Sequence, residues 1–221
     1  MVTPIHISPP YVLKLNYEFD FECLKNKIEE TVSYTKNSNA KHELEQGDST
    51  STNIHNVNGQ PHEWKESRHF INYLFQNMES ILDQMDLMKW PISIKGSWIN
   101  HHGYGGQTLE HNHGMMDIVM ACYIKCPENS GNIMFRDPLE YHRSSTYSQS
   151  FINQDPTCFW PYVEIPVKTN DIIVFPGWLW HKTQASNTEE DRYVMTINWK
   201  FEPPTFNRQK DKATGVYNYD T

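Results

Sequence analysis

Hydrophobic positions recur with two different periods along this chain, and each period predicts a different kind of element. Near the start, Asp20 is placed to cap a helix that ends near Asn37. The apolar residues of this helix, at three- and four-residue steps, are Phe21, Leu24, Ile28 and Val32. A second helix is predicted over residues 63–88, and its apolar stripe consists of Phe70, Leu74, Met78, Ile81, Leu82, Met85 and Met88. Both stripes need another part of the fold to cover them.

Between these helices the composition changes. Residues 38–61 are rich in Asn, Ser, Thr, Gly and Gln and contain almost no large apolar side chain. Such a segment has little to bury, so an exposed or mobile loop is predicted here.

From residue 91 the apolar period becomes two, which is typical of strands. The predicted strands begin at Ile92 and continue over residues 117–125, 132–135, 163–167, 171–175 and 192–201. Many short strands broken by Gly and Pro turns predict a mainly β fold, a double-sheet jelly roll packed against the preceding helices. The chain then divides into a helical support (1–90), a β core (91–202) and a tail (203–221), all within a single domain.

The last predicted strand has two unlike faces. Arg192, Val194, Thr196 and Asn198 share one face, and Tyr193, Met195, Ile197, Trp199 and Phe201 share the other. The strongly apolar face should lie under the helices, so Arg192 should point into the barrel.

Composition restricts the partners. With 38% hydrophobic and 21% charged residues the chain is typical of a globular protein, and its net charge of −8 argues against a general nucleic-acid-coating surface. The four cysteines form no CxxC pair, and neither a signal-peptide pattern nor a long apolar run is present. These features favour free thiols, a cytoplasmic location and no membrane association.

The candidate chemistry begins with histidines. His111 and His113 are separated by one residue, and His181 follows a hydrophobic strand about seventy residues later. Two ligands at one strand end and a distant third can hold a metal by one face and leave the other coordination positions open. Arg192, eleven residues after His181, suggests an anionic co-substrate.

An ordered set of motifs over residues 90–201 resembles the iron(II)- and 2-oxoglutarate-dependent oxygenases found often in bacteriophages and marine bacteria. The motifs are Ser97-Trp98-Ile99-Asn100, His111-Asn112-His113-Gly114, Ala121-Cys122-Tyr123-Ile124, Pro127-Glu128-Asn129-Ser130-Gly131, Phe135-Arg136-Asp137-Pro138, Phe175-Pro176-Gly177-Trp178-Leu179-Trp180-His181 and Arg192-Tyr193-Val194-Met195-Thr196-Ile197-Asn198.

The resemblance implies a double-stranded β-helix that uses iron(II), 2-oxoglutarate and dioxygen, with no nicotinamide or flavin. It implies that His111 and His181 are metal ligands and that Arg192 anchors the far carboxylate of 2-oxoglutarate. Tyr123 is similar to a tyrosine that donates a hydrogen bond to that carboxylate in related hydroxylases, and Thr196 lies on the same inward face as Arg192. Hydroxylation is the implied reaction, with a protein side chain favoured over a nucleobase or metabolite.

The sequence departs from the common family pattern at position 113. His113 stands where the superfamily usually has Asp or Glu, and its spacing makes it the preferred third ligand, with Asp117 as the alternative. Three imidazoles also suit zinc or nickel. His101 and His102 have no counterpart in the family motif and are interpreted as loop residues near the entrance.

Several alternatives remain open from the residues themselves. Tyr123 can be a core residue, and Arg192 can pair with a structural Asp. The aromatic residues Trp160, Tyr162, Trp178 and Trp180 are interpreted as core or barrel rim. A three-histidine cupin-like oxygenase without 2-oxoglutarate, or a non-catalytic metal-stabilised jelly roll such as a phage component, are the alternative functions.

Overall fold

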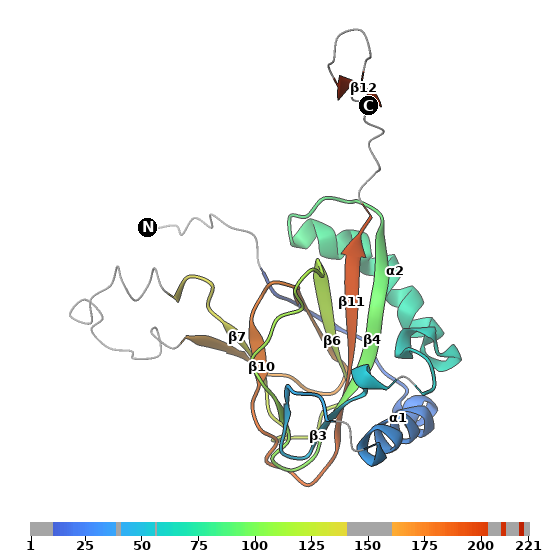
Figure 1. Ribbon diagram of the computed structural model, residues 1–221, viewed down its shortest axis with the longest axis vertical. Helices are drawn as coiled ribbons and strands as arrows, with labels where there is room; N and C mark the ends of the chain where they lie inside the picture. The colour runs from blue at the N-terminus through green and yellow to red at the C-terminus, as the bar shows by residue number, and fades with distance from the viewer. Residues whose placement is uncertain are drawn as a thin grey trace, which may run out of the picture.

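The computed structural model describes residues 11–38, 41–55, 57–140 and 161–202, together with the backbone of β12 (Gln209–Lys210) and β13 (Tyr217–Asn218), which pair with each other. Two helices lie on one side of a large sheet, and a smaller sheet lies on the other side (Figure 1). The helices are α1 (Phe21–Asn37) and α2 (Arg68–Gln84). Three short 3-10 turns connect the elements: Thr52–Ile54, Pro61–Glu63 and Lys65–Ser67.

The large sheet has six strands in the order β1-β9-β6-β11-β4-β3, and all of its neighbours are antiparallel. Its strands are β1 (Leu13–Asn16), β3 (Ser49–Ser51), β4 (Ile92–His102), β6 (Ile118–Lys125), β9 (Asp171–Pro176) and β11 (Arg192–Phe201). The small sheet, in the order β10-β7-β8, contains β7 (Ile133–Arg136), β8 (Tyr162–Ile165) and β10 (His181–Thr183). A separate pair joins β2 (Glu45–Gln46) to β5 (Gln107–Thr108). Two facing antiparallel sheets confirm the predicted jelly roll of the double-stranded β-helix type.

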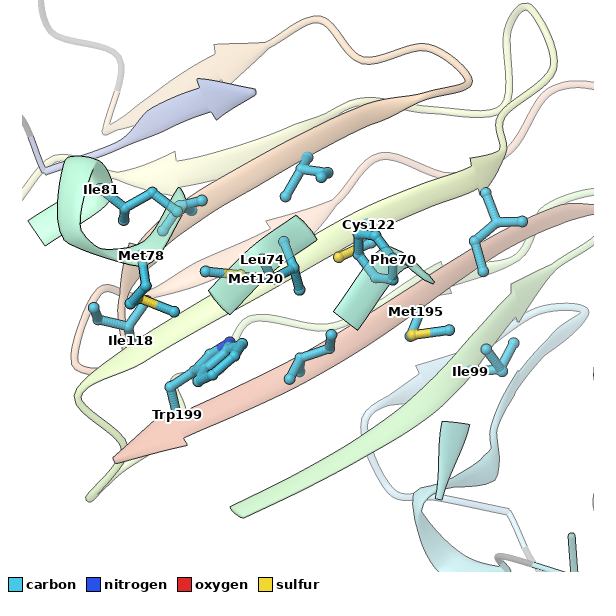
Figure 2. Packing of buried hydrophobic residues seen from close by; sticks show 14 of the residues in the cluster. Phe70, Leu74, Met78, Ile81, Ile99, Ile118, Met120, Cys122, Met195 and Trp199 are labelled. Carbon is cyan, nitrogen blue, oxygen red and sulfur yellow. The ribbon is translucent and has the colours of Figure 1, made fainter. Parts of the chain in front are cut away.

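The helices cover the outer face of the large sheet through a continuous apolar core. Met195, Ile197 and Trp199 of β11 are buried there completely, together with Leu74 of α2. Figure 2 shows the α2 side chains lying over the side chains of β6 and β11. The predicted alternation of β11 is therefore confirmed, because its apolar face packs under the helices and its polar face is left for the interior of the barrel.

Both helices form for the predicted reasons, although their ends differ. Asp20 caps α1 by accepting a hydrogen bond from the backbone N–H of Cys23 at 3.1 Å. Helix α2 begins later and ends earlier than predicted, since two 3-10 turns precede it and the helix stops at Gln84. Met88 was expected on the apolar stripe, but it lies beyond the helix and its side chain is 61% exposed.

The prediction of an exposed loop over residues 38–61 is wrong for residues 45–54. This stretch forms β2, β3 and a 3-10 turn, and β3 adds a strand to the edge of the large sheet beside β4. Thr52 is completely buried, and its hydroxyl accepts the backbone N–H of Ile99 at 3.0 Å. Hydrogen bonds rather than apolar area hold this segment in place, so hydropathy could not reveal it.

Neither helix in the described part of the chain has the length and apolar character that a membrane crossing requires. Among the described residues, Cys23, Cys122 and Cys126 are free thiols.

Candidate metal and co-substrate site

A cavity of about 440 Å³ lies inside the barrel. Side chains from β4, β6, β10 and β11 line it, together with the segment between β5 and β6. The three candidate histidines and Arg192 all line this one cavity. Tyr123 and Thr196 line it as well.

The backbone brings the histidines together. His111 and His181 form an isolated antiparallel bridge, in which the N–H of each residue donates to the carbonyl of the other at 2.9 Å. The N–H of His113 donates to the carbonyl of Gly177 at 2.8 Å, so the same two segments hold all three residues. Gly177 is required there, because a Cβ at this position would lie 2.1 Å from the carbonyl oxygen of Met116. The ligand atoms that the three histidines can offer all lie within 4.8 Å of one another.

The hydrogen bonds of two histidines define their proton positions. Nδ1 of His111 lies 2.7 Å from the carbonyl of Leu109, and Nδ1 of His181 lies 2.9 Å from the carbonyl of Leu179. A carbonyl only accepts, so each Nδ1 carries the hydrogen and each Nε2 keeps a free lone pair. Burial lowers the pKa of both side chains, and for His181 the neighbouring histidines lower it further. Both rings are therefore neutral at neutral pH, which is the form that binds a metal.

His113 fits a metal site on an independent observation. Its Nε2 is buried and has no hydrogen-bond partner among the described residues. Burial lowers its pKa to about 3, with a smaller contribution from His111. Its ring stacks on the indole of Trp98 with centroids 5.7 Å apart, which limits its orientation. A buried nitrogen without a partner is costly unless something binds it, and a divalent cation in contact with three imidazoles would do so.

The alternative ligand Asp117 is engaged elsewhere. Its carboxylate accepts the backbone N–H of Phe201 at 2.7 Å and the ammonium of Lys200 at 3.3 Å. Among the described residues, the metal-capable group contains His111, His113 and His181 and does not include Asp117. The geometry therefore favours His113 as the third ligand.

Arg192 lies at the start of β11 with 2% of its surface exposed. Its Nη1 donates to the carbonyls of Ser130 and Gly131, both at 2.9 Å, and its Nε has no acceptor among the described residues. No carboxylate in the described part of the chain forms a salt bridge with it, so the structural Asp considered from the sequence is not found there. A buried guanidinium with a free donor suits an incoming carboxylate.

Tyr123 lies close to this arginine, and Thr196 lies on the same face of β11. The Tyr123 side chain, on β6, is 1% exposed, and the Arg192 Cζ lies 5.1 Å from its ring centroid. Burial raises the pKa of the Tyr123 hydroxyl, so this group is a neutral donor. Thr196 faces inward as predicted, and its hydroxyl accepts a hydrogen bond from the Asn100 amide at 3.0 Å. Tyr123 thus belongs both to the inner core and to the cavity wall.

Two histidines are not where the sequence suggested. His101 and His102 were interpreted as entrance loop residues, but both belong to β4 and are almost fully buried. His101 faces outward and lies 2.6 Å from Asp191, whereas His102 lines the cavity. Strand β4 extends to His102, closer to the glycine-rich turn than the sequence indicated.

The sequence also failed to indicate Glu45. This residue lies on β2, lines the cavity and is 5% exposed. No motif marked it, because it lies in the segment that was expected to be a loop.

The exposed tryptophans belong to the rim. Trp178 and Trp180 are 48% and 47% exposed, so both are rim residues and neither is a core residue. Trp160 lies outside the described residues.

Comparison with known proteins gives one family match. Residues 96–198 match the family model described as "Putative 2OG-Fe(II) oxygenase". Among curated protein sequences, none matches the chain.

Solved structures with the same fold have low sequence identity. AviO1 from Streptomyces viridochromogenes Tue57 has a TM-score of 0.58 at 12% identity, with 89% of this chain and 91% of that chain covered. A Pseudomonas putida prolyl-4-hydroxylase has a TM-score of 0.51 at 8% identity, with 87% and 93% covered. The non-heme alpha ketoglutarate dependent carbocyclase SnoK from nogalamycin biosynthesis has a TM-score of 0.53 at 11% identity, with 86% and 79% covered.

Residues 96–198 thus match the 2OG-Fe(II) oxygenase family model, and the barrel has the fold of the solved structures named above. The cofactors of this family are iron(II) and 2-oxoglutarate, and the three-histidine group is one that could bind iron. The family match implies dioxygen as the second co-substrate.

Proposed function

We propose that this oxygenase hydroxylates a C–H bond, using iron(II) bound by His111, His113 and His181. The observation that supports the proposal is the pairing, within one cavity, of three neutral imidazoles with a buried arginine whose Nε lacks an acceptor. Neither half alone distinguishes an oxygenase from other metal sites. Together they provide one place for a divalent metal and another for a carboxylate.

Each residue has a specific task in this proposal. Iron(II) with 2-oxoglutarate and dioxygen supplies the oxidising power for an unactivated C–H bond. Arg192 binds the distal carboxylate and so fixes the orientation of the co-substrate, while Tyr123 donates a hydrogen bond to the same carboxylate. Thr196 contributes polar lining between Arg192 and the metal end. Phe175, whose ring centroid lies 4.7 Å from that of His181, keeps water away from one side of the metal ligands.

The substrate that we propose is a side chain of a protein or peptide. Three fold neighbours are described as prolyl hydroxylases, which makes peptides the first substrates to test. Other neighbours are described as an epimerase and a carbocyclase, so the same fold also serves other reactions. A peptide hydroxylation would be detected as a gain of one oxygen in the peptide mass, together with equimolar succinate.

The metal ligands are tested by iron retention. His181→Ala should lose bound iron(II) after anaerobic reconstitution and desalting, because one of three ligands is removed from a site that the strands otherwise preserve. The matched control is His69→Ala, which removes an exposed histidine of α2. Iron content in His181→Ala equal to that of the control would remove His181 from the metal site.

The alternative functions give different results in one titration. An iron(II)-loaded sample titrated with 2-oxoglutarate under anaerobic conditions should develop the weak visible charge-transfer band of the chelate. A cupin-like oxygenase that needs no 2-oxoglutarate, or a non-catalytic metal-stabilised jelly roll, would not develop this band. Absence of the band in the wild-type protein would contradict the proposed use of 2-oxoglutarate.

A further inference from the structure

The wall of the cavity beside Arg192 contains a chain of buried polar groups. His102 is the cross-strand partner of Arg192 in the pairing of β4 with β11. The His102 Nε2 lies 3.0 Å from the hydroxyl oxygen of Thr108, and that hydroxyl donates to the Glu45 Oε1 at 3.2 Å. Thr108 and Glu45 are themselves paired between β5 and β2. The order His102, Thr108, Glu45 therefore leads from the neighbour of Arg192 to a buried carboxylate.

Glu45 is the only carboxylate among the described residues that line the cavity. The groups that face it are the hydroxyls of Ser49 and Thr108, the charges of Lys41 and Arg192, and the His102 imidazole, whose Nε2 lies 3.8 Å from Oε2. Burial lowers the pKa of His102 well below its usual value, and Arg192 and His101 lower it further, so this ring is neutral. The Lys41 ammonium is exposed and donates to the Gly47 carbonyl. Among the residues that the structure describes, Arg192 is thus the only buried cation near Glu45.

The charges at this end of the cavity balance only while no co-substrate is bound. An ionised Glu45 and Arg192 sum to zero. A further carboxylate on Arg192 would leave one uncompensated negative charge in a buried place, where two carboxylates near each other do not both stay ionised. Glu45 is the group that can adjust, since burial, its largest influence, raises its pKa to about 7 despite the opposing hydrogen bonds and cations.

We propose that Glu45 is a co-substrate-binding residue that acts in its protonated form: the distal carboxylate of 2-oxoglutarate is held between Arg192 and a neutral Glu45, which takes its proton from solvent on binding. This inference rests on the proposed function, because it requires 2-oxoglutarate to bind at Arg192. The charge at this end of the cavity is conserved, since one carboxylate of 2-oxoglutarate and one proton enter it together.

The consequence is that 2-oxoglutarate binding depends on pH. Above the pKa of Glu45 in the free protein, each bound 2-oxoglutarate must be accompanied by a proton, so the dissociation constant should rise with pH. With a free-state pKa of about 7 the dissociation constant should rise about tenfold between pH 6 and pH 8. Both carboxylates of 2-oxoglutarate are ionised over this range, so the co-substrate itself adds no such dependence.

Proton uptake can be measured directly. The iron(II)-loaded protein would be titrated anaerobically with 2-oxoglutarate in a calorimeter, at pH 8, in buffers that differ in ionisation heat. The wild-type protein should take up nearly one proton per bound 2-oxoglutarate. Glu45→Gln keeps the size of the side chain but cannot ionise, so it should take up almost none and should bind equally well at pH 6 and pH 8.

A matched control separates the local effect from net charge. Glu43→Gln makes the same change of charge two residues away, at an exposed position of the same segment. It should retain the proton uptake and pH dependence of the wild type. Thr108→Val provides a second variant that leaves Glu45 in place. Loss of its hydrogen bond to the carboxylate should move the rise in dissociation constant to higher pH.

The outcomes distinguish this inference from the function on which it rests. Wild-type protein that binds 2-oxoglutarate with no proton uptake and no pH dependence would overturn the role of Glu45 and leave the oxygenase proposal intact. Proton uptake that persists in Glu45→Gln would also overturn it. Iron-loaded wild-type protein that binds no 2-oxoglutarate at any pH would instead refute the proposed function.

Discussion

Replacement of Arg192 by alanine is the most informative single change, because it removes the buried guanidinium without removing a metal ligand. In the intact protein this group is 2% exposed, donates to two backbone carbonyls and has an Nε without an acceptor. In the variant, a 2-oxoglutarate carboxylate at this position would be buried without its charged partner. Truncation of one partner of such a pair costs about 2–5 kcal/mol, a rise of roughly thirty-fold or more in the dissociation constant.

Iron content and 2-oxoglutarate affinity would be measured on the same anaerobic preparations, at a pH near 6.5 where the contribution of Glu45 is small. Arg192→Lys should recover part of the affinity, since an ammonium retains the charge but not the planar two-point geometry. The control is Arg136→Ala on β7, which removes a half-exposed arginine that is paired with Glu140. Iron content should be the same in all of these variants.

Loss of Arg192 also leaves the carbonyls of Ser130 and Gly131 without their donor, so the fold of the variant has to be checked separately. The melting temperature of the iron-loaded protein serves for this purpose. A variant with retained iron and weakened 2-oxoglutarate binding fits the reasoning. Wild-type 2-oxoglutarate affinity in Arg192→Ala would refute the assignment of Arg192 as the carboxylate anchor.

Three further predictions concern the third metal ligand, the buried Glu45 and the packing of α2 on the large sheet. His113→Ala should lose iron while Asp117→Asn should retain it; the reverse result would make the carboxylate the third ligand. Glu45 has a folded-state pKa of about 7, above its unfolded value, so its contribution to stability is present below pH 4.5 and is lost as pH rises through 7. In urea unfolding, the free energy of unfolding of Glu45→Gln should therefore rise by up to about 3 kcal/mol relative to that of the wild type between pH 4.5 and pH 8. A difference that does not change with pH would contradict this. Leu74→Ala, at a completely buried position of α2, should lower the free energy of unfolding by about 2–5 kcal/mol. Met88→Ala, at an exposed position, should change the free energy of unfolding by no more than about 0.5 kcal/mol. Equal effects of the two substitutions would mean that the helix does not cover the sheet as described.

The sequence predicted those parts of the fold in which apolar side chains are buried. The outer face of β11 carries Met195, Ile197 and Trp199 at a period of two, and their burial under the helices fixes the register of the whole strand. A shift of one residue would place Arg192 on the apolar face under the helices and turn Trp199 into the barrel interior, at a cost that no local interaction could offset. For this reason the inward position of Arg192 could be predicted before any site was known.

The candidate metal residues were predictable for a different reason. His111 and His113 are one residue apart, and His181 follows a hydrophobic strand and completes an order of motifs that resembles a known family. Spacing alone could not show that the His111–His181 backbone bridge brings these residues together, or that Asp117 is already occupied by the end of β11. Those are contacts between distant segments, which a single sequence does not encode in any local pattern.

Glu45 shows what a hydropathy pattern omits. The segment around it has almost no large apolar side chain, yet Ser49, Thr50, Ser51 and Thr52 are buried there. A polar group that forms a hydrogen bond inside the protein replaces the one it made with water, so its burial costs little free energy. Burial of this kind leaves no hydrophobic pattern in the sequence. The same property makes the segment suitable for function, because a wall built of hydroxyls and one protonated carboxyl group can donate hydrogen bonds to a bound anion, which an apolar wall cannot do.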